Sequence, residues 1–159
     1  MSRDHKTFMR EAIKEGYKAL PADDVPVGAV VVSNGRIIGR GYNQVELLND
    51  PTAHAEMIAI TAAASTIGDK WLGEATLYVT VEPCAMCAGA SVLARLKQVV
   101  YGVQDIKTGA HSSLFNLLND PRLNHQIEVV PGVEKEACAA LMMDFFQSLR
   151  NQRKENRER

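Results

Sequence analysis

Three short segments carry the residue types that could bind a metal ion and move a proton. His54 and Glu56 stand two positions apart in the sequence. Cys84 and Cys87 form a C-x-x-C pair directly after Pro83. On a helix that begins near Pro83 the two cysteines are i and i+3, so both thiols lie on one side and can share a single ion. Two thiolates and one imidazole form a soft donor set that suits zinc in a tetrahedral site.

The number of protein ligands separates a structural zinc site from a catalytic one. A structural zinc ion is closed by four protein ligands, whereas a catalytic one leaves a position for water. His54, Cys84 and Cys87 supply three donors, so we expect an open fourth position. Residues i and i+2 lie roughly 200° apart on a regular helix, so His54 and Glu56 can face one point only at a helix start. There Glu56 acts as a proton shuttle for water and is not a ligand.

Other interpretations of the same residue types stay open at this point. A C-x-x-C pair is also typical of redox pairs and of half a structural zinc site. The third cysteine, Cys138, lies in an apolar helical pattern that is typical of a small buried hydrophobe. His111 and His125 lie in polar segments and could supply a fourth ligand, the alternative for each being a solvated or RNA-facing imidazole.

Four β-type segments are predicted around these residues. They are Val27 to Val32, Ile37 to Tyr42, Leu77 to Val81 and Val99 to Val103. The first two flank Asn34-Gly35, the dipeptide favoured in a tight type I′ turn, which predicts a hairpin. A helix from Pro83 to about Arg95 joins the last two as a βαβ unit, which favours parallel strands and a right-handed crossover.

Helical patterns precede, separate and follow these strands. The predicted helices span Asp4 to Leu20, Ala53 to Ile67 and Glu134 to about Arg153. The first and last are amphipathic, and the middle one is rich in alanine, which has a strong helix propensity. We also expect a short helix over Ser112 to Leu118 and a strand over Ile127 to Val130. The order of elements predicts an α/β fold, with helices layered on a mixed sheet that begins with a hairpin.

The length and the net charge of the chain limit the classes of function that it can have. A chain of 159 residues, 46% of them hydrophobic, predicts one domain over residues 1–159 with a substantial core. The formal net charge of -1 excludes a histone-like wrapper, so any field that attracts a polyanion must be local. A basic tail from about residue 150 is a candidate phosphate contact, the alternatives being cations at a helix C-terminus or a solvated, frayed end. Its cations are Arg150, Arg153, Lys154, Arg157 and Arg159.

Cysteine usage and hydropathy indicate the compartment. The chain has 3 cysteines, two of them in one close pair, which is atypical of a disulfide framework. Met1 to Glu11 has no apolar stretch of signal-peptide length. No apolar run approaches the roughly 20 residues that are needed to span a bilayer. We therefore expect a cytoplasmic protein without a membrane partner.

Taken in order, H-x-E followed by P-C-x-x-C matches the signature of zinc deaminases. Over nearly its whole length the sequence resembles the bacterial tRNA-specific adenosine deaminases of the cytidine deaminase-like superfamily. The segments that carry the resemblance are Val25–Val30, Gly41–Asn43, Asp50–Glu56, Leu77–Thr80, Glu82–Ala90, Lys107–Ala110, Asn124-His125 and Asp144–Phe146. The metal motif is shared across the superfamily, while the downstream segments favour the tRNA branch over free-base deaminases.

The resemblance implies a three-layer α/β/α sandwich, a homodimer, and hydrolysis of the wobble adenosine of a tRNA anticodon loop to inosine. It implies one zinc ion per chain, held by His54, Cys84 and Cys87, with Glu56 moving protons. Asn43 matches a family position beside the base, where an amide can donate and accept hydrogen bonds simultaneously. The alternative for Asn43 is a turn-forming residue at a strand end.

Two further residues lie in the loop after the predicted fourth strand, where the family borders the RNA. They are Asp105 and Lys107, and we hypothesise that Asp105 accepts a hydrogen bond from a ribose 2′-hydroxyl. An anticodon loop is a sensible substrate because a hairpin loop presents unstacked bases at low cost. Two other functions are compatible with the same motifs. The protein could be a deaminase of free bases or nucleosides, or a non-catalytic RNA-binding module in which zinc only stabilises the fold.

Overall fold

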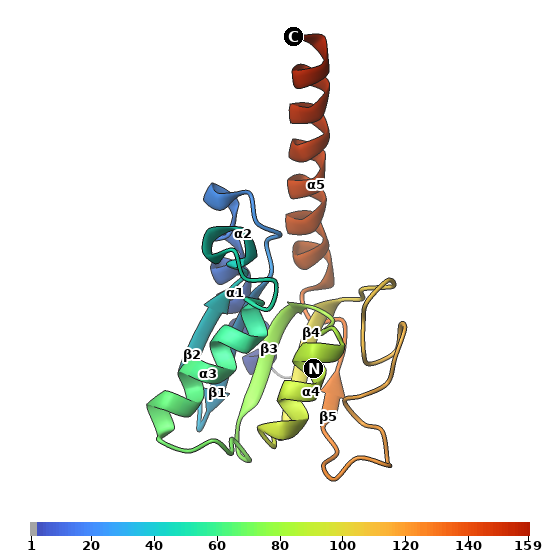
Figure 1. The fold of residues 1–159 in the computed structure, drawn as a ribbon. Helices are drawn as coiled ribbons and strands as arrows, with labels where there is room; N and C mark the ends of the chain where they lie inside the picture. Colours follow the sequence, from blue (N-terminus) through green and yellow to red (C-terminus); the bar gives the residue numbers. More distant parts are fainter. Residues whose placement is uncertain (1–2) are drawn as a thin grey trace.

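A mixed β-sheet forms the centre of the molecule in the computed structural model, which describes residues 3–159 (Figure 1). Within this range the sheet has five strands in the order β2-β1-β3-β4-β5. They are β1 (Gly28–Ser33), β2 (Arg36–Tyr42), β3 (Thr76–Val81), β4 (Gln98–Val103) and β5 (Glu128–Val130). β1 is antiparallel to β2 and β3, whereas β3, β4 and β5 run parallel. The predicted hairpin and the parallel βαβ unit are confirmed.

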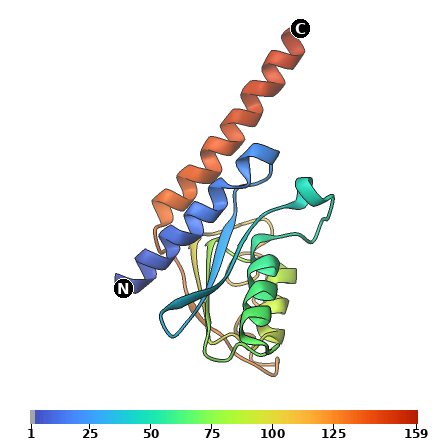
Figure 2. The same ribbon diagram turned by 90° about the vertical axis from the view of Figure 1, so that its left-hand side faces the viewer.

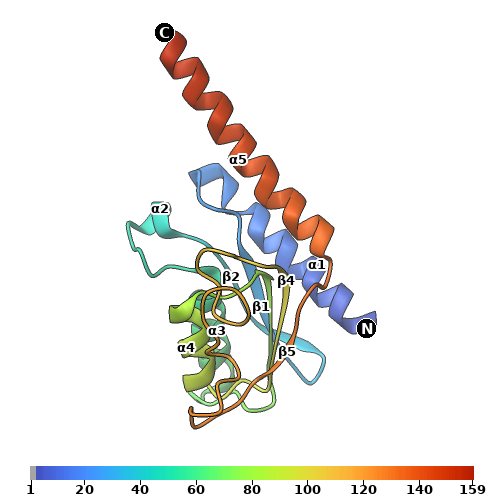
Figure 3. The ribbon, with the colours of Figure 1, turned by 90° about the vertical axis from the view of Figure 1, so that its right-hand side faces the viewer.

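Helices cover both faces of the sheet, which confirms the three-layer arrangement (Figures 2 and 3). One face carries α1 (Arg3–Tyr17) and α5 (Lys135–Glu158), and the other carries α3 (Ala55–Ile67) and α4 (Ala85–Leu93). Two short elements, the 3-10 turn η1 (Leu20–Ala22) and the one-turn helix α2 (Val45–Leu48), lie in the connections. No helix within residues 3–159 is both long enough and apolar enough to cross a membrane.

The strands divide the core into two layers because successive side chains point to opposite faces of a sheet. Val30, Tyr78 and Val100 pack with the layer that contains Met9 of α1 and Cys138 of α5. The alternate strand residues pack on the α3 and α4 side: Ala29, Val31, Leu77, Val79, Val99 and Tyr101. The sheet therefore separates Cys138 from the other two cysteines.

Helix α3 lies directly on β2 because glycines remove the side chains between them. A Cβ atom at Gly39 would overlap the backbone carbonyl of Ala59, and one at Gly41 would overlap that of Ala55. The inward side of α3 is made of small residues that include Ala55, Ala59 and Ala63, all fully buried. This close contact fixes the start of α3, where the H-x-E pair lies.

Helices α1 and α3 differ from the expected boundaries by up to three residues, and two further differences, in α4 and α5, bear on the site and the tail. Helix α4 begins at Ala85 with Cys84 as its N-cap, so Pro83 precedes the helix instead of occupying its first turn. Helix α5 continues to Glu158, beyond the expected end near Arg153, because no glycine or proline interrupts its sequence. The basic tail is therefore helical, which argues against the alternative of a frayed end.

The segment 112–118 forms turns and not the short helix expected there. The backbone N–H groups of Leu114 and Phe115 both donate to the Gly109 carbonyl, at 2.9 and 3.0 Å, and the N–H of Leu117 donates to the Ala110 carbonyl at 2.8 Å, so the segment lacks the i to i−4 hydrogen bonds of a helix. Hydrogen bonds to carbonyls that precede the segment thus replace the helical pattern expected there. The strand expected from Ile127 to Val130 is present as β5, which begins one residue later.

Candidate active site

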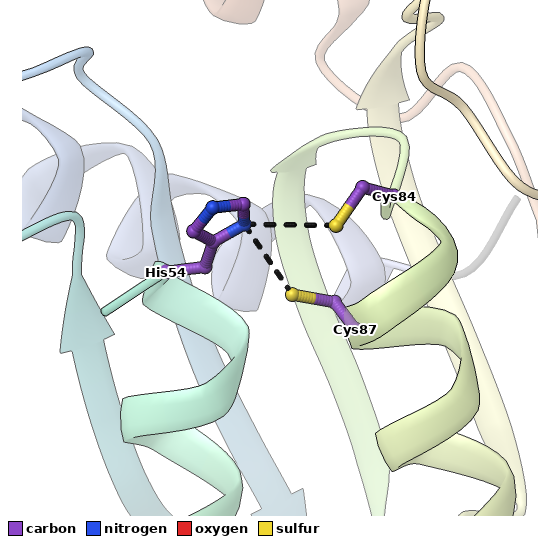
Figure 4. Close-up of side chains that lie close together, drawn as sticks. All are labelled: His54, Cys84 and Cys87. Atoms are coloured by element: carbon purple, nitrogen blue, oxygen red, sulfur yellow. Dashed lines mark hydrogen bonds between the residues drawn. The ribbon is translucent and has the colours of Figure 1, made fainter. Parts of the chain in front are cut away.

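His54, Cys84 and Cys87 converge where the N-termini of α3 and α4 meet (Figure 4). The Nδ1 atom of His54 lies 3.6 Å from the Sγ atom of each cysteine. All three donor atoms lie within 4.8 Å of one another. Among residues 3–159, no other group of three or more His, Cys, Asp or Glu side chains is placed in this way. The arrangement offers three converging donors to one metal ion.

The backbone at the two helix starts explains how these side chains meet. His54 is the N-cap of α3 and Cys84 is the N-cap of α4, and both have extended backbone, with ψ of 150° and 175°. An extended N-cap turns its side chain away from the helical spiral, so His54 can reach the same region as Glu56 in the first turn of the helix. The backbone of Pro51 also contributes to raising the pKa of His54.

Hydrogen bonds among the three donor groups change their pKa values in a direction that favours binding of a cation. A hydrogen bond from Cys87 and, after it, one from His54 lower the pKa of Cys84 to about 4. The hydrogen bond with Cys84 raises the pKa of His54. The hydrogen bond that the Cys87 thiol donates to Cys84, together with burial, raises the pKa of Cys87. The cluster therefore holds a thiolate stabilised by two donors, and a metal ion would replace those protons.

Glu56 is a buried acid beside this cluster. Its side chain is 4% exposed and its carboxyl hydrogen-bonds the thiol of Cys87. Burial, followed by the nearby charge of Cys84, raises the pKa of Glu56 to about 6. Glu56 lies outside the three-donor group. A carboxyl group whose pKa is near neutrality can both accept and return a proton at physiological pH.

A pocket of about 270 Å³ opens over the cluster. This is near the lower end of the range for small-molecule sites, so it has room for one base-sized group. Its lining, as far as the described residues show, contains no lysine or arginine. It does contain six carboxylates, from Asp23, Asp24, Glu46, Glu56, Glu82 and Asp105. Phosphate groups of a ligand must therefore lie outside the pocket, on cations carried elsewhere.

Asn43 lines this pocket and also holds the start of α3. Its Oδ1 atom accepts a hydrogen bond of 2.8 Å from the backbone N–H of Ala55. The structure thereby adds a helix-capping role that the sequence did not indicate. Because Oδ1 is engaged, the amide nitrogen is the atom left for a ligand, and the role of Asn43 toward a base stays a prediction.

Asp105 lines the pocket, and Lys107 lies two residues further along the loop after β4, outside the lining. Asp105 Oδ1 accepts hydrogen bonds from the backbone N–H groups of Lys107 and Thr108, at 3.1 and 3.2 Å, and Oδ2 accepts one from the Thr108 hydroxyl at 2.8 Å. The carboxylate thus shapes its own turn while lining the pocket. Lys107 is exposed. Their contacts with RNA stay predictions.

Glu82 has a role that sequence reasoning missed. It is 3% exposed, and its Oε1 accepts hydrogen bonds from the backbone N–H of Asp105 and the hydroxyl of Ser113. Its Oε2 accepts from the backbone N–H groups of His111, Ser112 and Ser113, at 3.0, 3.1 and 3.3 Å. Burial raises the pKa of Glu82, but these hydrogen bonds outweigh it, so the pKa is lowered. Its one sequence signal is a carboxylate at the end of a buried strand.

The loop that Glu82 organises rests on the metal-binding segment. The backbone N–H of Ala110 donates to the carbonyl of Pro83 at 2.8 Å, and Cys84 forms an isolated β-bridge with Gly109. A Cβ atom at Gly109 would overlap the Glu82 carboxylate. The pocket wall formed by the 104–113 loop is therefore fixed directly to the segment that carries Cys84.

The other candidate ligands are engaged elsewhere. His111 Nδ1 hydrogen-bonds the Tyr101 hydroxyl at 2.9 Å, and His125 Nε2 hydrogen-bonds the Leu96 carbonyl at 2.7 Å. Both imidazoles are half-buried and lie outside the three-donor group, and a contact of either one with RNA stays a prediction. Cys138 is fully buried on the far side of the sheet, and burial raises its pKa to about 12.

Comparison with known sequences identifies similar proteins. Residues 3–150 match the model of the MafB19-like deaminase family. The chain is 48% identical over 158 residues to the tRNA-specific adenosine deaminase of Bacillus subtilis (strain 168), an alignment that covers 99% of this chain and 98% of that protein.

Solved structures of deaminases are also similar to this chain. A structure from a study of A-to-I editing by tRNA:A34 deaminases at the wobble position of transfer RNA superposes with a TM-score of 0.81 and 41% identity, over 85% of this chain and 98% of that one. A guanine deaminase from Bacillus subtilis superposes with a TM-score of 0.60 and 34% identity, over 72% of this chain and 82% of that one. Of these two structures, the first is the more similar in both sequence and shape.

Proposed function

Because the chain belongs to the family of tRNA-specific adenosine deaminases, we propose that it converts the wobble adenosine of a tRNA anticodon to inosine by hydrolysis. The observation that carries this function is the juxtaposition of three metal donors with a buried acid under a base-sized pocket. Adenosine and water give inosine and ammonia: a C6–O bond forms and the bond from C6 to the exocyclic amine breaks.

His54, Cys84 and Cys87 hold one zinc ion per chain in this proposal. The fit rests on their chemistry, because two sulfurs and one imidazole nitrogen that lie within 4.8 Å of one another match the soft, tetrahedral preference of zinc. When bound, zinc supplies a Lewis acid that lowers the pKa of a water molecule from 15.7 to about 7.

Glu56 moves the protons of the reaction. Its carboxylate accepts a proton from the attacking water and passes it to a ring nitrogen of adenine. A second transfer through the same carboxyl group protonates the departing amine, which leaves as ammonia. Burial keeps Glu56 out of bulk water and its pKa at about 6, so both the charged and the neutral form are accessible at neutral pH.

Residues of the pocket rim position the nucleotide. The amide nitrogen of Asn43 faces the base edge while its oxygen holds α3. Asp105 accepts a ribose 2′-hydroxyl, and exposed Lys107 lies near the backbone of the RNA. The target base leaves its stack to enter the pocket, at a lower cost from a hairpin loop than from a duplex.

The protein acts as a homodimer in the cytoplasm, where tRNA is modified. The homodimer is carried by the resemblance to the family, and large apolar side chains exposed on three helices provide apolar surface for it. They are Leu47 and Leu48 of α2, Ile67 of α3 and Leu93 of α4, which are between 46% and 79% exposed. Sedimentation equilibrium of the purified protein tests the dimer.

The function is tested with a tRNA pool incubated with the purified, zinc-loaded protein and sequenced for inosine. Ammonia release from guanine, cytidine and an anticodon stem-loop is measured in parallel. Inosine at the wobble position, with no ammonia from the free compounds, is the expected result. If ammonia were released from guanine alone, the protein would be a free-base deaminase and the proposal would be wrong. A Glu56→Ala variant is also measured. If it binds zinc and RNA and has the same turnover as the unaltered protein, Glu56 is not the proton shuttle.

A further inference from the structure

The C-terminal part of α5 projects from the body of the protein (Figures 1 and 2). The buried side chains of α5 are Cys138, Leu141 and Phe145, all in its first half. Every residue from 150 to 159 is exposed. A helical end without tertiary contacts gains no stability from packing, so the residues on it face solvent or a partner.

Four cations of this end lie on one face of the helix. Arg150, Arg153, Lys154 and Arg157 are i, i+3, i+4 and i+7, and we call them the basic stripe. With 3.6 residues per turn they fall within an arc of about 100°. The two acidic residues of the same end, Glu155 and Glu158, lie outside that arc.

The charge spacing of the basic stripe gives the helix no net stability, because the one opposite-charge i,i+4 pair, Lys154 with Glu158, is outnumbered by like-charged pairs. In the part of the chain that the structure describes, none of its members forms an ion pair, and Arg150 donates only to the side-chain amide oxygen of Gln147. Two like-charged pairs, Arg150 with Lys154 and Arg153 with Arg157, have the i,i+4 spacing that destabilises a helix. Attraction to the helix dipole is confined to the last turn, whereas the stripe begins two turns from the end.

Two members of the basic stripe continue the side of α5 that faces the pocket. Met142 lines the pocket, and Phe146, one turn later, is 44% exposed. Arg153 and Arg157 lie 11 and 15 residues beyond Met142, about three and four turns, and therefore on nearly the same side. At 1.5 Å per residue the stripe begins about 12 Å from Met142 and ends about 22 Å from it.

These observations complement the acidic pocket, which offers no cation to phosphate. We propose that the basic stripe binds the phosphate backbone of the anticodon stem while the pocket takes a base from the loop. The inference rests on the proposed function, since it takes tRNA as the substrate. Its distance from the pocket places the stripe beside nucleotides that flank the loop and not beside the target nucleotide. Contacts to phosphate fix register and orientation without reading sequence.

The test replaces the four cations by glutamine (R150Q, R153Q, K154Q and R157Q together). A matched control removes four exposed cations far from the stripe (K6Q, R36Q, K70Q and K97Q together). Deamination kinetics of an intact tRNA and of a short single-stranded loop oligonucleotide are measured between 50 and 200 mM salt. Circular dichroism verifies that both variants keep their helical content, and a chain ending at Leu149 provides a second way to remove the stripe.

For the stripe variant we expect KM for tRNA to rise about tenfold or more at low salt, because each lost phosphate contact weakens binding. The slope of log KM against log salt should fall by about 3, since four contacts contribute roughly 0.7 to 0.9 each. The rise in KM for the oligonucleotide should be much smaller. The proposal is overturned if the stripe variant and the control share one KM and salt slope for tRNA. It is also overturned if tRNA and oligonucleotide are affected equally. Absence of inosine with the unaltered protein would instead refute the proposed function.

Discussion

Replacing Glu82 should loosen the 104–113 loop in a graded way, more with alanine than with glutamine. The carboxylate accepts hydrogen bonds from four backbone N–H groups and one hydroxyl. Glutamine can place its carbonyl oxygen at the Oε2 position and keep three of those N–H donors. Its NH₂ group then faces the N–H of Asp105, which loses its acceptor, while the Ser113 hydroxyl can rotate to accept instead.

The magnitudes follow from the number of donors left without a partner. A buried donor deprived of its acceptor costs about 1–3 kcal/mol. Glu82→Gln leaves one such donor, so we expect a loss of about 2 kcal/mol in the free energy of unfolding. Glu82→Ala leaves four N–H groups that the loop must hydrate or rearrange, for an expected loss of about 4 kcal/mol at roughly 1 kcal/mol each.

Urea unfolding measures these losses, and amide hydrogen exchange locates them. Exchange should accelerate at Asp105, His111, Ser112 and Ser113 and stay unchanged in the strands. The control is Glu74→Gln, an exposed position that should change stability by less than about 0.5 kcal/mol. A Glu82→Ala protein whose stability lies within 1 kcal/mol of the control, or whose loop amides exchange at the original rate, would refute the reasoning.

The same carboxylate predicts a pH dependence. Because its pKa is lowered from 4.5 in the folded state, Glu82 contributes stability at pH values above 4.5. That contribution is lost as the pH falls through the folded pKa and the carboxylate takes up a proton. The stability difference between the unaltered protein and Glu82→Gln should therefore be constant near pH 7 and shrink below pH 4.5. A difference that grows on acidification would contradict the lowered pKa.

Three further predictions concern the metal donors, the acid and the helix that carries them. Glu56→Gln should lower kcat by about 10²- to 10⁴-fold, the usual contribution of a general acid–base, while zinc content measured by mass spectrometry stays at one per chain. Cys84→Ala should reduce bound zinc and lower the melting temperature to that of the chelator-treated protein, and chelator should then produce no further decrease. Gly41→Ala should cost about 1–3 kcal/mol of stability because its Cβ overlaps the carbonyl of Ala55, whereas Gly73→Ala, with no atom within 4 Å of the new methyl, should leave the melting temperature unchanged.

The sequence determined those parts of the site whose partners are close along the chain. Cys84 and Cys87 share one side of a helix because of their i, i+3 spacing, and the i, i+2 spacing of His54 and Glu56 required a helix start. The structure has both features, with His54 and Cys84 as N-caps. The hairpin was equally local, since Asn34-Gly35 supplies two residues with positive φ, 51° and 72°, as a type I′ turn needs.

Only the tertiary structure decided the contacts between distant segments. The hydrogen bonds of Glu82 reach 23 to 31 residues along the chain, and the N–H of Leu117 donates to the Ala110 carbonyl in place of a helical acceptor within 112–118. The cations of the basic stripe could be counted in the sequence, but their alignment with the pocket depends on how α5 packs beside Met142. Periodicity specifies which residues share a face of their own element. Which face of another element they meet depends on how buried surfaces and buried hydrogen-bonding groups are satisfied over the whole chain.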